Sequence, residues 1–277
     1  MPVESISIII PWCNRDELER SLRENSPRLK NNNIEIIVVN CGGNGNTLRP
    51  RLSKLALPSA RWLELKVGHF NKSFALNVGV SYASYEALFF LDADVILRDR
   101  AIEDGMSLLS EGSFVTIERV HESKAVPENF NSAIKSVNHC IELVDQEGSK
   151  HQLATNTLNL ETRTRAAPGL VFVRKEDFIR VGGMNSALQG WGWEDLDLLA
   201  RLQISIGLTR YQAGAVLHLS HDDDVRDLTG IAASANEALN FSKCLASYCL
   251  GDFLGTYVDD AQIGSALCET YFLSPVD

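Results

Sequence analysis

Short apolar runs alternate with segments of helical periodicity along the first half of the chain. Four runs have the composition of strands buried on both faces, at residues 5–11, 34–39, 61–65 and 87–91. After the first run, Leu18 and Leu22 share one face of a helix that Asn14 is placed to cap, and residues 72–84 have the pattern of another helix. This alternation predicts an α/β fold with a mostly parallel sheet flanked by helices.

The second half of the chain has a mixed pattern. We expect strands at residues 113–120, 169–174 and 214–219, and a helix at 194–206. Residues 121–167 have a weak pattern, for which we expect a long excursion with some helix.

Glycines and helical patterns mark the remaining segments. Residues 182–192 form a glycine-rich loop, which we expect to close over a bound ligand. The chain reads as helical from residue 227 onward. We therefore expect a main domain at 1–225, with a nucleotide-binding part at about 1–100 and an acceptor and metal part at about 101–225. A helical extension at 226–277 would pack on it.

Composition narrows the class of protein. The chain has 277 residues, 45% hydrophobic, and a net charge of −10. This acidic balance argues against a nucleic-acid partner, which needs a basic surface. No stretch approaches the roughly 20 apolar residues of a membrane span. The six cysteines form no Cys-x-x-Cys pair, so reduced thiols in a cytoplasmic protein are the expectation, with contact at a membrane surface left open.

Three loops follow the carboxyl ends of predicted parallel strands, at residues 12–15, 40–46 and 92–94. In open α/β sheets, ligands bind beyond these ends. We therefore expect the three loops to surround one cleft.

Carboxylates and imidazoles near this cleft suggest a metal site. Asp92-x-Asp94 directly follows an apolar strand, and His218-x-x-His221 follows a late one. Carboxylate oxygens suit Mg²⁺ and Mn²⁺, and imidazole suits Mn²⁺. The alternative is a pair of turns with solvated side chains.

The segment Trp191-Gly-Trp193-Glu194-Asp195 opens the late helix. Two tryptophans in a glycine loop are well shaped to stack on a sugar or a base. A carboxylate beside aromatic rings is suited to act as a general base. The alternative for the two acids is an interaction with the helix dipole.

Two aromatic and basic segments are candidates for nucleotide binding. Trp12 would flank a base, and Arg15 would meet phosphate at a helix start. Phe70 and Lys72 would add a second aromatic wall and a second cation. The alternatives are a core tryptophan and an ordinary surface arginine.

Taken together and in order, these residues resemble the GT-A glycosyltransferases. The opening IIIPWCNRDELERSL is similar to the start of the β-1,4-galactosyltransferases and of the family 2 enzymes. FNKSFALNVG and FFLDADVIL resemble the following nucleotide-side elements, and WGWEDLDLLARL resembles an element in the C-terminal portion of the galactosyltransferases. The resemblance covers roughly residues 5–224. The chain departs from it at Asn40-Cys-Gly-Gly43, where many members have Asp-Asp-Gly-Ser, and at Cys13, where some members have a basic residue. It also departs at Trp193, which either replaces a glycine or is followed by a deletion of two glycines.

The resemblance implies a role for each matched residue. The positions that line the nucleotide are Pro11, Trp12, Asn14, Arg15 and Phe70, with Asp92 and Ala93 at the ribose. Asp94 matches the metal ligand and is joined by His221, with His218 as a further candidate. Trp193 and Glu194 match the acceptor platform, and Asp195 matches the catalytic base of inverting members.

The implied function is that of a metal-dependent inverting glycosyltransferase in polysaccharide biosynthesis. It would use Mn²⁺ or Mg²⁺ and move a sugar from a nucleotide-sugar, with UDP as the favoured nucleotide, to a hydroxyl of a saccharide or glycoconjugate. Two alternatives stay open. One is a nucleotidyltransferase acting on sugar phosphates, and the other is a non-catalytic sugar-binding relative.

Overall fold

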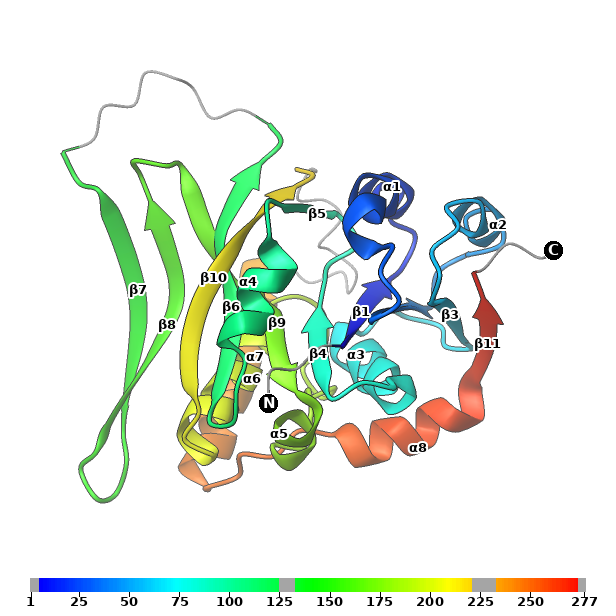
Figure 1. The fold of residues 1–277 in the computed structure, drawn as a ribbon. Coiled ribbons are helices and arrows are strands. Elements are labelled where there is room, and N and C mark those ends of the chain that lie inside the picture. The colour runs from blue at the N-terminus through cyan, green and yellow to red at the C-terminus, as the bar shows by residue number, and fades with distance from the viewer. Residues whose placement is uncertain (1–4, 125–132, 221–232, 274–277) are drawn as a thin grey trace.

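The computed structural model describes residues 5–124, 133–220 and 233–273 (Figure 1). The strands are β1 Ile6–Trp12, β2 Ile34–Cys41, β3 Ala60–Leu65, β4 Ala87–Phe90, β5 Val95–Arg98, β6 Ser113–Glu122, β7 Ser136–Val144, β8 Lys150–Asn159, β9 Thr164–Arg174, β10 Thr209–His218 and β11 Cys268–Phe272. The helices are α1 Glu17–Leu29, α2 Arg49–Ser53, α3 Lys72–Tyr82, α4 Ala101–Leu108, α5 Lys175–Arg180, α6 Glu194–Ala200, α7 Ala233–Cys249 and α8 Tyr257–Leu267. A π-helical turn at Arg201–Ser205 continues α6.

One mixed sheet runs through the molecule in the order β11-β3-β2-β1-β4-β9-β6-β10-β5. Strands β3, β2, β1 and β4 pair in parallel, as the first half of the sequence predicts. In the second half, β6 and β10 are parallel, whereas β9 and β5 pair antiparallel with their neighbours. The α/β fold class of the GT-A type is confirmed, with a sheet that is mixed rather than mostly parallel.

Alternate residues of the central strand β1 belong to two hydrophobic layers, one on each face of the sheet. Ile8 and Ile10 of β1 pack with α1, α2 and α4, whereas Ile9 packs with α3, α5 and α6. Because helices cover both faces, β1 is apolar at nearly every position instead of alternating.

The expected helix within residues 121–167 is wrong for the described part of that segment. β7 and β8 form a long antiparallel hairpin that projects from the sheet, and β8 joins β9 through Leu158 and Asn159 (Figure 1). Leu153 of β8 is buried in the second hydrophobic layer. Leu153 is the only fully buried residue of these two strands, and the apolar side chains of β7, such as Val137 and Ile141, stay partly exposed. Burial therefore imposes no strong period on the segment, which explains why the sequence pattern misses the hairpin.

The C-terminal segment is helical over α7 and α8, as expected. It then ends in a strand, β11, which pairs antiparallel with β3 at the edge of the sheet. Helix α8 lies against α3, where Gly264 faces Val78. Among the described helices, none is both long and apolar enough to cross a membrane. The division of the chain at residue 225 stays a prediction.

Candidate active site

Strand register brings Asp94 and His218 together from distant parts of the sequence. β10 lies between β5 and β6, and its last residue, His218, stands opposite Val95 on one side and Glu122 on the other. His218 Nε2 lies 3.7 Å from Asp94 Oδ2, and His218 Nδ1 lies 2.7 Å from Glu122 Oε2. The contact with Asp94, followed by the hydrogen bond with Glu122, raises the pKa of His218.

These residues fit part of a metal site. Asp94 and His218 present an oxygen and a nitrogen donor toward each other, and Glu122 holds the second ring nitrogen, as carboxylates do behind metal-bound histidines. Within the described ranges, no group of three or more histidine, cysteine, aspartate or glutamate side chains is arranged to hold a metal. His221, the other expected ligand, lies outside the described residues.

Arg15 and Asp94 form an ion pair beyond the carboxyl end of β1. The Arg15 Nη2 atom lies 2.7 Å from Asp94 Oδ2. The loop after β1 therefore supplies a cation directly beside the expected metal ligand, where a diphosphate would be bound.

Lys72 connects the two acidic motifs. Its Nζ atom lies 3.2 Å from Asp92 Oδ1 and 3.0 Å from Asp195 Oδ2. Burial lowers the pKa of Lys72, but the charges of Asp195 and Asp92 outweigh burial and raise it. Burial raises the pKa of Asp92, against the opposing charge of Lys72. One lysine thus fixes the strand-end pair and the acids of α6 relative to each other.

The two acids that open α6 have different surroundings. Glu194 is 7% exposed, and its Oε2 atom has no hydrogen-bond partner among the described residues. Burial, followed by the charge of Asp195, raises the pKa of Glu194 to about 7. Asp195 is packed against the backbone of β9, where a Cβ on Gly169 would lie 2.2 Å from its Oδ2 atom. A glycine is therefore needed at 169 for the carboxylate to occupy this position.

A cavity of about 680 Å³ lies along the carboxyl edge of the sheet. The predicted site residues that line it are Pro11, Arg15, Phe70, Lys72, Asp92, Ala93, Asp94, Trp191, Glu194, Asp195 and His218. Two of the three expected loops contribute to it, whereas no residue of the loop at 40–46 lines it.

Trp12 and Asn14 differ from expectation. The Trp12 side chain is buried, packs on Trp62 with ring centroids 5.2 Å apart, and donates from Nε1 to the Arg15 carbonyl oxygen. In this position the indole belongs to the core, and the expectation that it flanks a base is wrong. Asn14 does not cap α1, which begins at Glu17 after Asp16; its Oδ1 accepts from the Asn44 amide instead.

The side chain of Asn40 holds the loop that follows β2 in place. Asn40, which stands where many relatives have an aspartate, is fully buried. Its Nδ2 donates to the Gly43 carbonyl and to Glu64, and its Oδ1 accepts from the Gly43 amide. These bonds turn the amide inward, away from the cavity.

Trp193 lies in a second cavity of about 380 Å³ that adjoins the first. Its φ is 72°, in the left-handed region that favours glycine. This agrees with the family resemblance, in which a glycine stands at this position. The indole stacks on Phe241 of α7, with ring centroids 4.3 Å apart, so packing accompanies the strained backbone.

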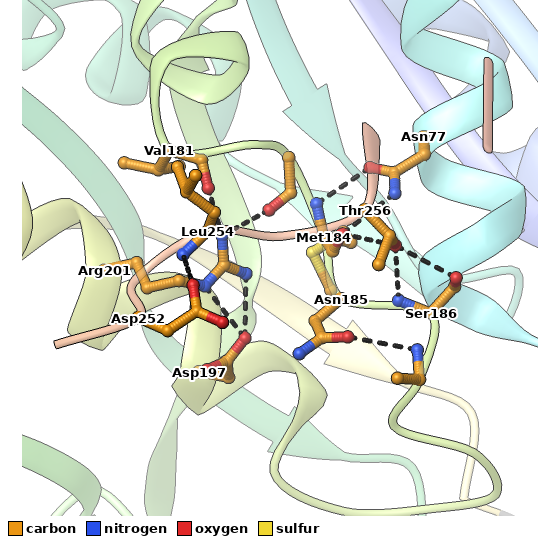
Figure 2. A network of polar contacts seen from close by, with 12 residues as sticks. Asn77, Val181, Met184, Asn185, Ser186, Asp197, Arg201, Asp252, Leu254 and Thr256 are labelled. Atoms are coloured by element: carbon orange, nitrogen blue, oxygen red, sulfur yellow. Dashed lines mark hydrogen bonds and ion pairs between the residues drawn. The ribbon is translucent and has the colours of Figure 1, made fainter. Parts of the chain in front are cut away.

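The glycine-rich loop at 182–192 is not a free lid. Figure 2 shows Arg201 donating to the carbonyl of Val181 while it pairs with Asp197. Arg201 also donates to the carbonyl of Gly183. Asn77 exchanges two hydrogen bonds with the backbone of Met184 (Figure 2). The start of the loop is therefore fixed to α3 and α6, and the expectation that the whole loop closes over a ligand does not fit these contacts.

Several lining residues were missed by the sequence reasoning. They are Glu122, Asn156, Arg165 and Gly169. Glu122 ends β6 at the carboxyl edge, and this strand-end position was the signal for it. Arg165 pairs with Glu122 at 3.1 Å, a contact that depends on the antiparallel pairing of β9 with β6.

Two family models match the chain, and two curated proteins are similar to part of it. Residues 7–176 match the model of glycosyl transferase family 2, and residues 149–222 match that of the N-terminal domain of galactosyltransferase. The chain is 30% identical over 104 residues to poly(ribitol-phosphate) beta-N-acetylglucosaminyltransferase TarP of Staphylococcus aureus, covering 37% of this chain and 32% of that protein. It is 31% identical over 99 residues to poly-beta-1,6-N-acetyl-D-glucosamine synthase of Staphylococcus epidermidis, covering 36% of this chain and 24% of that protein.

The chain thus spans at most about a third of the length of these relatives. The family 2 model, by contrast, matches well over half of the chain and includes β1 to β4 with the Asp92-x-Asp94 pair. The chain therefore belongs to glycosyl transferase family 2, a family of transferase enzymes.

Proposed function

We propose that this chain transfers a sugar, with inversion, from a nucleotide-sugar to a hydroxyl of a saccharide or glycoconjugate. The observation that carries the proposal is the line of groups along one cavity: His218 and Asp94, then Asp92, Lys72 and Asp195. One end suits a diphosphate and the other suits an acceptor hydroxyl. The sugar would lie between them.

The donor would bind on the β1 and β4 side. Arg15 is positioned to exchange its Asp94 partner for a phosphate oxygen. Phe70 and Pro11 line the same wall and give apolar contact to the nucleoside. UDP is our first choice of nucleotide by family resemblance.

A divalent cation, Mn²⁺ or Mg²⁺, would be held by Asp94 and His218, with Glu122 orienting the imidazole. When bound, such a cation neutralises the charge of a departing diphosphate. Arg15 would contribute a second positive charge to the neutralisation of the diphosphate.

The acceptor would bind beside the tryptophans of the α6 loop. Asp195 lines both cavities, so its carboxylate is placed to take the proton of an acceptor hydroxyl that attacks the sugar carbon. Lys72 holds this carboxylate in position. Glu194 lies next to it, and its Oε2 atom is buried without a hydrogen-bond partner among the described residues.

The relatives suggest the sugar. Both are named for N-acetylglucosamine, one as a transferase and one as a synthase of a polymer. UDP-N-acetylglucosamine is therefore the first donor to test, and polysaccharide biosynthesis is the proposed setting. A cytoplasmic location with contact at a membrane surface stays part of the proposal.

The test is release of UDP from UDP-sugars in the presence of Mn²⁺, with and without saccharide acceptors. We expect the purified chain to release UDP, and Asp195→Asn to lower kcat by about 10²–10⁴, the size of general-base assistance, while nucleotide binding persists. Release of pyrophosphate from UTP and a sugar phosphate, without release of UDP from UDP-sugars, would instead indicate a nucleotidyltransferase. Sugar binding without any UDP release would indicate a non-catalytic relative.

A further inference from the structure

One face of α7 holds the tryptophan loop. Asn236 Nδ2 donates to the carbonyl oxygens of Gln189 and Trp191, both at 2.8 Å. Asn240 Nδ2 donates to the carbonyl oxygens of Gln189 at 3.0 Å and Gly192 at 2.9 Å. Both asparagines are nearly fully buried. Two side chains one helical turn apart thus satisfy three carbonyls of the loop that presents the tryptophans.

The contact between this helix and the loop is close. A Cβ on Gly190 would lie 2.5 Å from Asn236 Nδ2, and one on Gly192 would lie 2.9 Å from the Cβ of Glu237. Phe241 of the same face stacks on Trp193. The position of α7 relative to the loop is therefore set by hydrogen bonds, by an aromatic contact and by glycines that allow the approach. Helix α7 lies beyond both family-model matches, which end at residues 176 and 222.

Glu237 is the residue of this face that reaches the second cavity. It lines that cavity with Trp191, Trp193, Glu194 and Asp195, and it is half-buried. The neighbouring hairpin adds His139 and Thr155 to the opposite wall.

The charges of this cavity favour one class of ligand. Three of its described lining residues are acids, namely Glu194, Glu237 and Asp195, the last of which is paired with Lys72 at 3.0 Å. The single lysine or arginine among them is Arg165, which is paired with Glu122 at 3.1 Å. A phosphate group here would meet like charge without a free cation, which costs binding energy. A neutral saccharide would instead stack on the tryptophans and donate its hydroxyls to the carboxyl groups. The carboxylates of Asp195 and Glu237, which line this cavity, are acceptors for such hydroxyls.

We infer that Glu237 is a specificity-determining residue, and that the second cavity takes an uncharged saccharide acceptor in preference to a phosphate-bearing one. This inference rests on the proposed transfer reaction for its biological meaning. The ligand preference of the cavity is nevertheless measurable by binding alone.

The test is a titration followed by tryptophan fluorescence, which Trp191 and Trp193 make sensitive to ligand in this cavity. The two probes are a neutral oligomer of N-acetylglucosamine and an oligomer of glycerol phosphate. We expect the wild-type chain to prefer the neutral oligomer. Glu237→Lys should weaken that binding about tenfold and strengthen binding of the phosphate oligomer, and Glu237→Gln should weaken the neutral oligomer to a smaller extent while leaving the fold intact.

The matched control is Glu111→Lys, which makes the same charge change at an exposed position just before β6, at the opposite edge of the sheet. Its binding should equal that of the wild type. A wild-type preference for the phosphate oligomer, or unchanged affinities for both oligomers in Glu237→Lys, would overturn the inference. A chain that binds the neutral oligomer but releases no UDP would overturn the proposed function and leave this inference standing.

Discussion

Lys72 Nζ lies 3.0 Å from Asp195 Oδ2, although the two residues are on different helices and 123 positions apart. The same ammonium group lies 3.2 Å from Asp92 Oδ1. The side chain of Lys72 is 15% exposed, so little water is present to replace it. It is therefore the connection between the proposed donor side and the proposed acceptor side of the cavity.

Replacement of Lys72 should push the carboxylates of Asp92 and Asp195 apart. Lys72→Met leaves Asp92 and Asp195 facing each other without a cation, and like charges at this separation repel. We expect a loss of at least about tenfold in kcat/KM, with partial recovery in Lys72→Arg, measured by UDP release. Wild-type kinetics in Lys72→Met would show that the lysine positions neither acid.

Gly169→Ala should displace the Asp195 carboxylate without changing its chemistry. The new Cβ would lie 2.2 Å from Asp195 Oδ2, so the carboxylate has to move, while the end of a side chain gives way without unfolding the protein. A displacement of about 1 Å in a reacting group costs about 10²-fold in rate, and we expect kcat to fall by that order.

Gly68→Ala is the matched control for this substitution, because a Cβ there meets no atom within 4 Å. Its kcat should equal that of the wild type. If Gly169→Ala turned over at the same rate as Gly68→Ala, the assignment of Asp195 as the base would lose its geometric support.

The raised pKa of Glu194 predicts that the stability of the fold depends on pH. Burial, with the charge of Asp195, raises the pKa of Glu194 to about 7 from the usual value of 4.5. The folded chain therefore binds more protons than the unfolded chain between these values, and the free energy of unfolding falls as pH rises from about 4.5 to about 7. Glu194→Gln removes this penalty. Its Tm should exceed that of the wild type by a few degrees at pH 8 and by much less at pH 4.5; a Tm difference that did not grow with pH would contradict the assignment.

Asp94 predicts how nucleotide and metal binding are linked. If Asp94 holds the cation, UDP should raise the Tm of the wild-type chain more in the presence of Mn²⁺ than in EDTA, because ligand that binds only the folded state stabilises it. Asp94→Ala should remove this difference. Asp104→Ala, at an exposed acid on α4, is the control and should keep it. An equal effect of Mn²⁺ in Asp94→Ala would exclude this residue as the metal ligand.

Much of the core and part of the site follow from local sequence. The run at β1 is apolar at consecutive positions, which requires cover on both faces, and Ile8 and Ile9 do pack into opposite layers. Asp92 and Asp94 follow β4 directly, so their place at the carboxyl edge of the sheet is fixed by their distance along the chain. The tryptophan loop and the acids of α6 are likewise contiguous in sequence.

Other features were decided by contacts between distant segments. Trp12 has the same local pattern as a residue that stacks on a base, but its indole is buried against Trp62. The hairpin of β7 and β8 is stabilised by its pairing and by the burial of Leu153, neither of which leaves a strong period in the sequence.

The sequence by itself determined the α/β class, the strand-end acids and the aromatic loop, because each depends on residues that are neighbours along the chain. Only the tertiary structure decided that His218 meets Asp94, and the reason is register. His218 pairs with Val95 across the antiparallel contact of β10 and β5, and a shift of one residue would turn its side chain to the other face of the sheet.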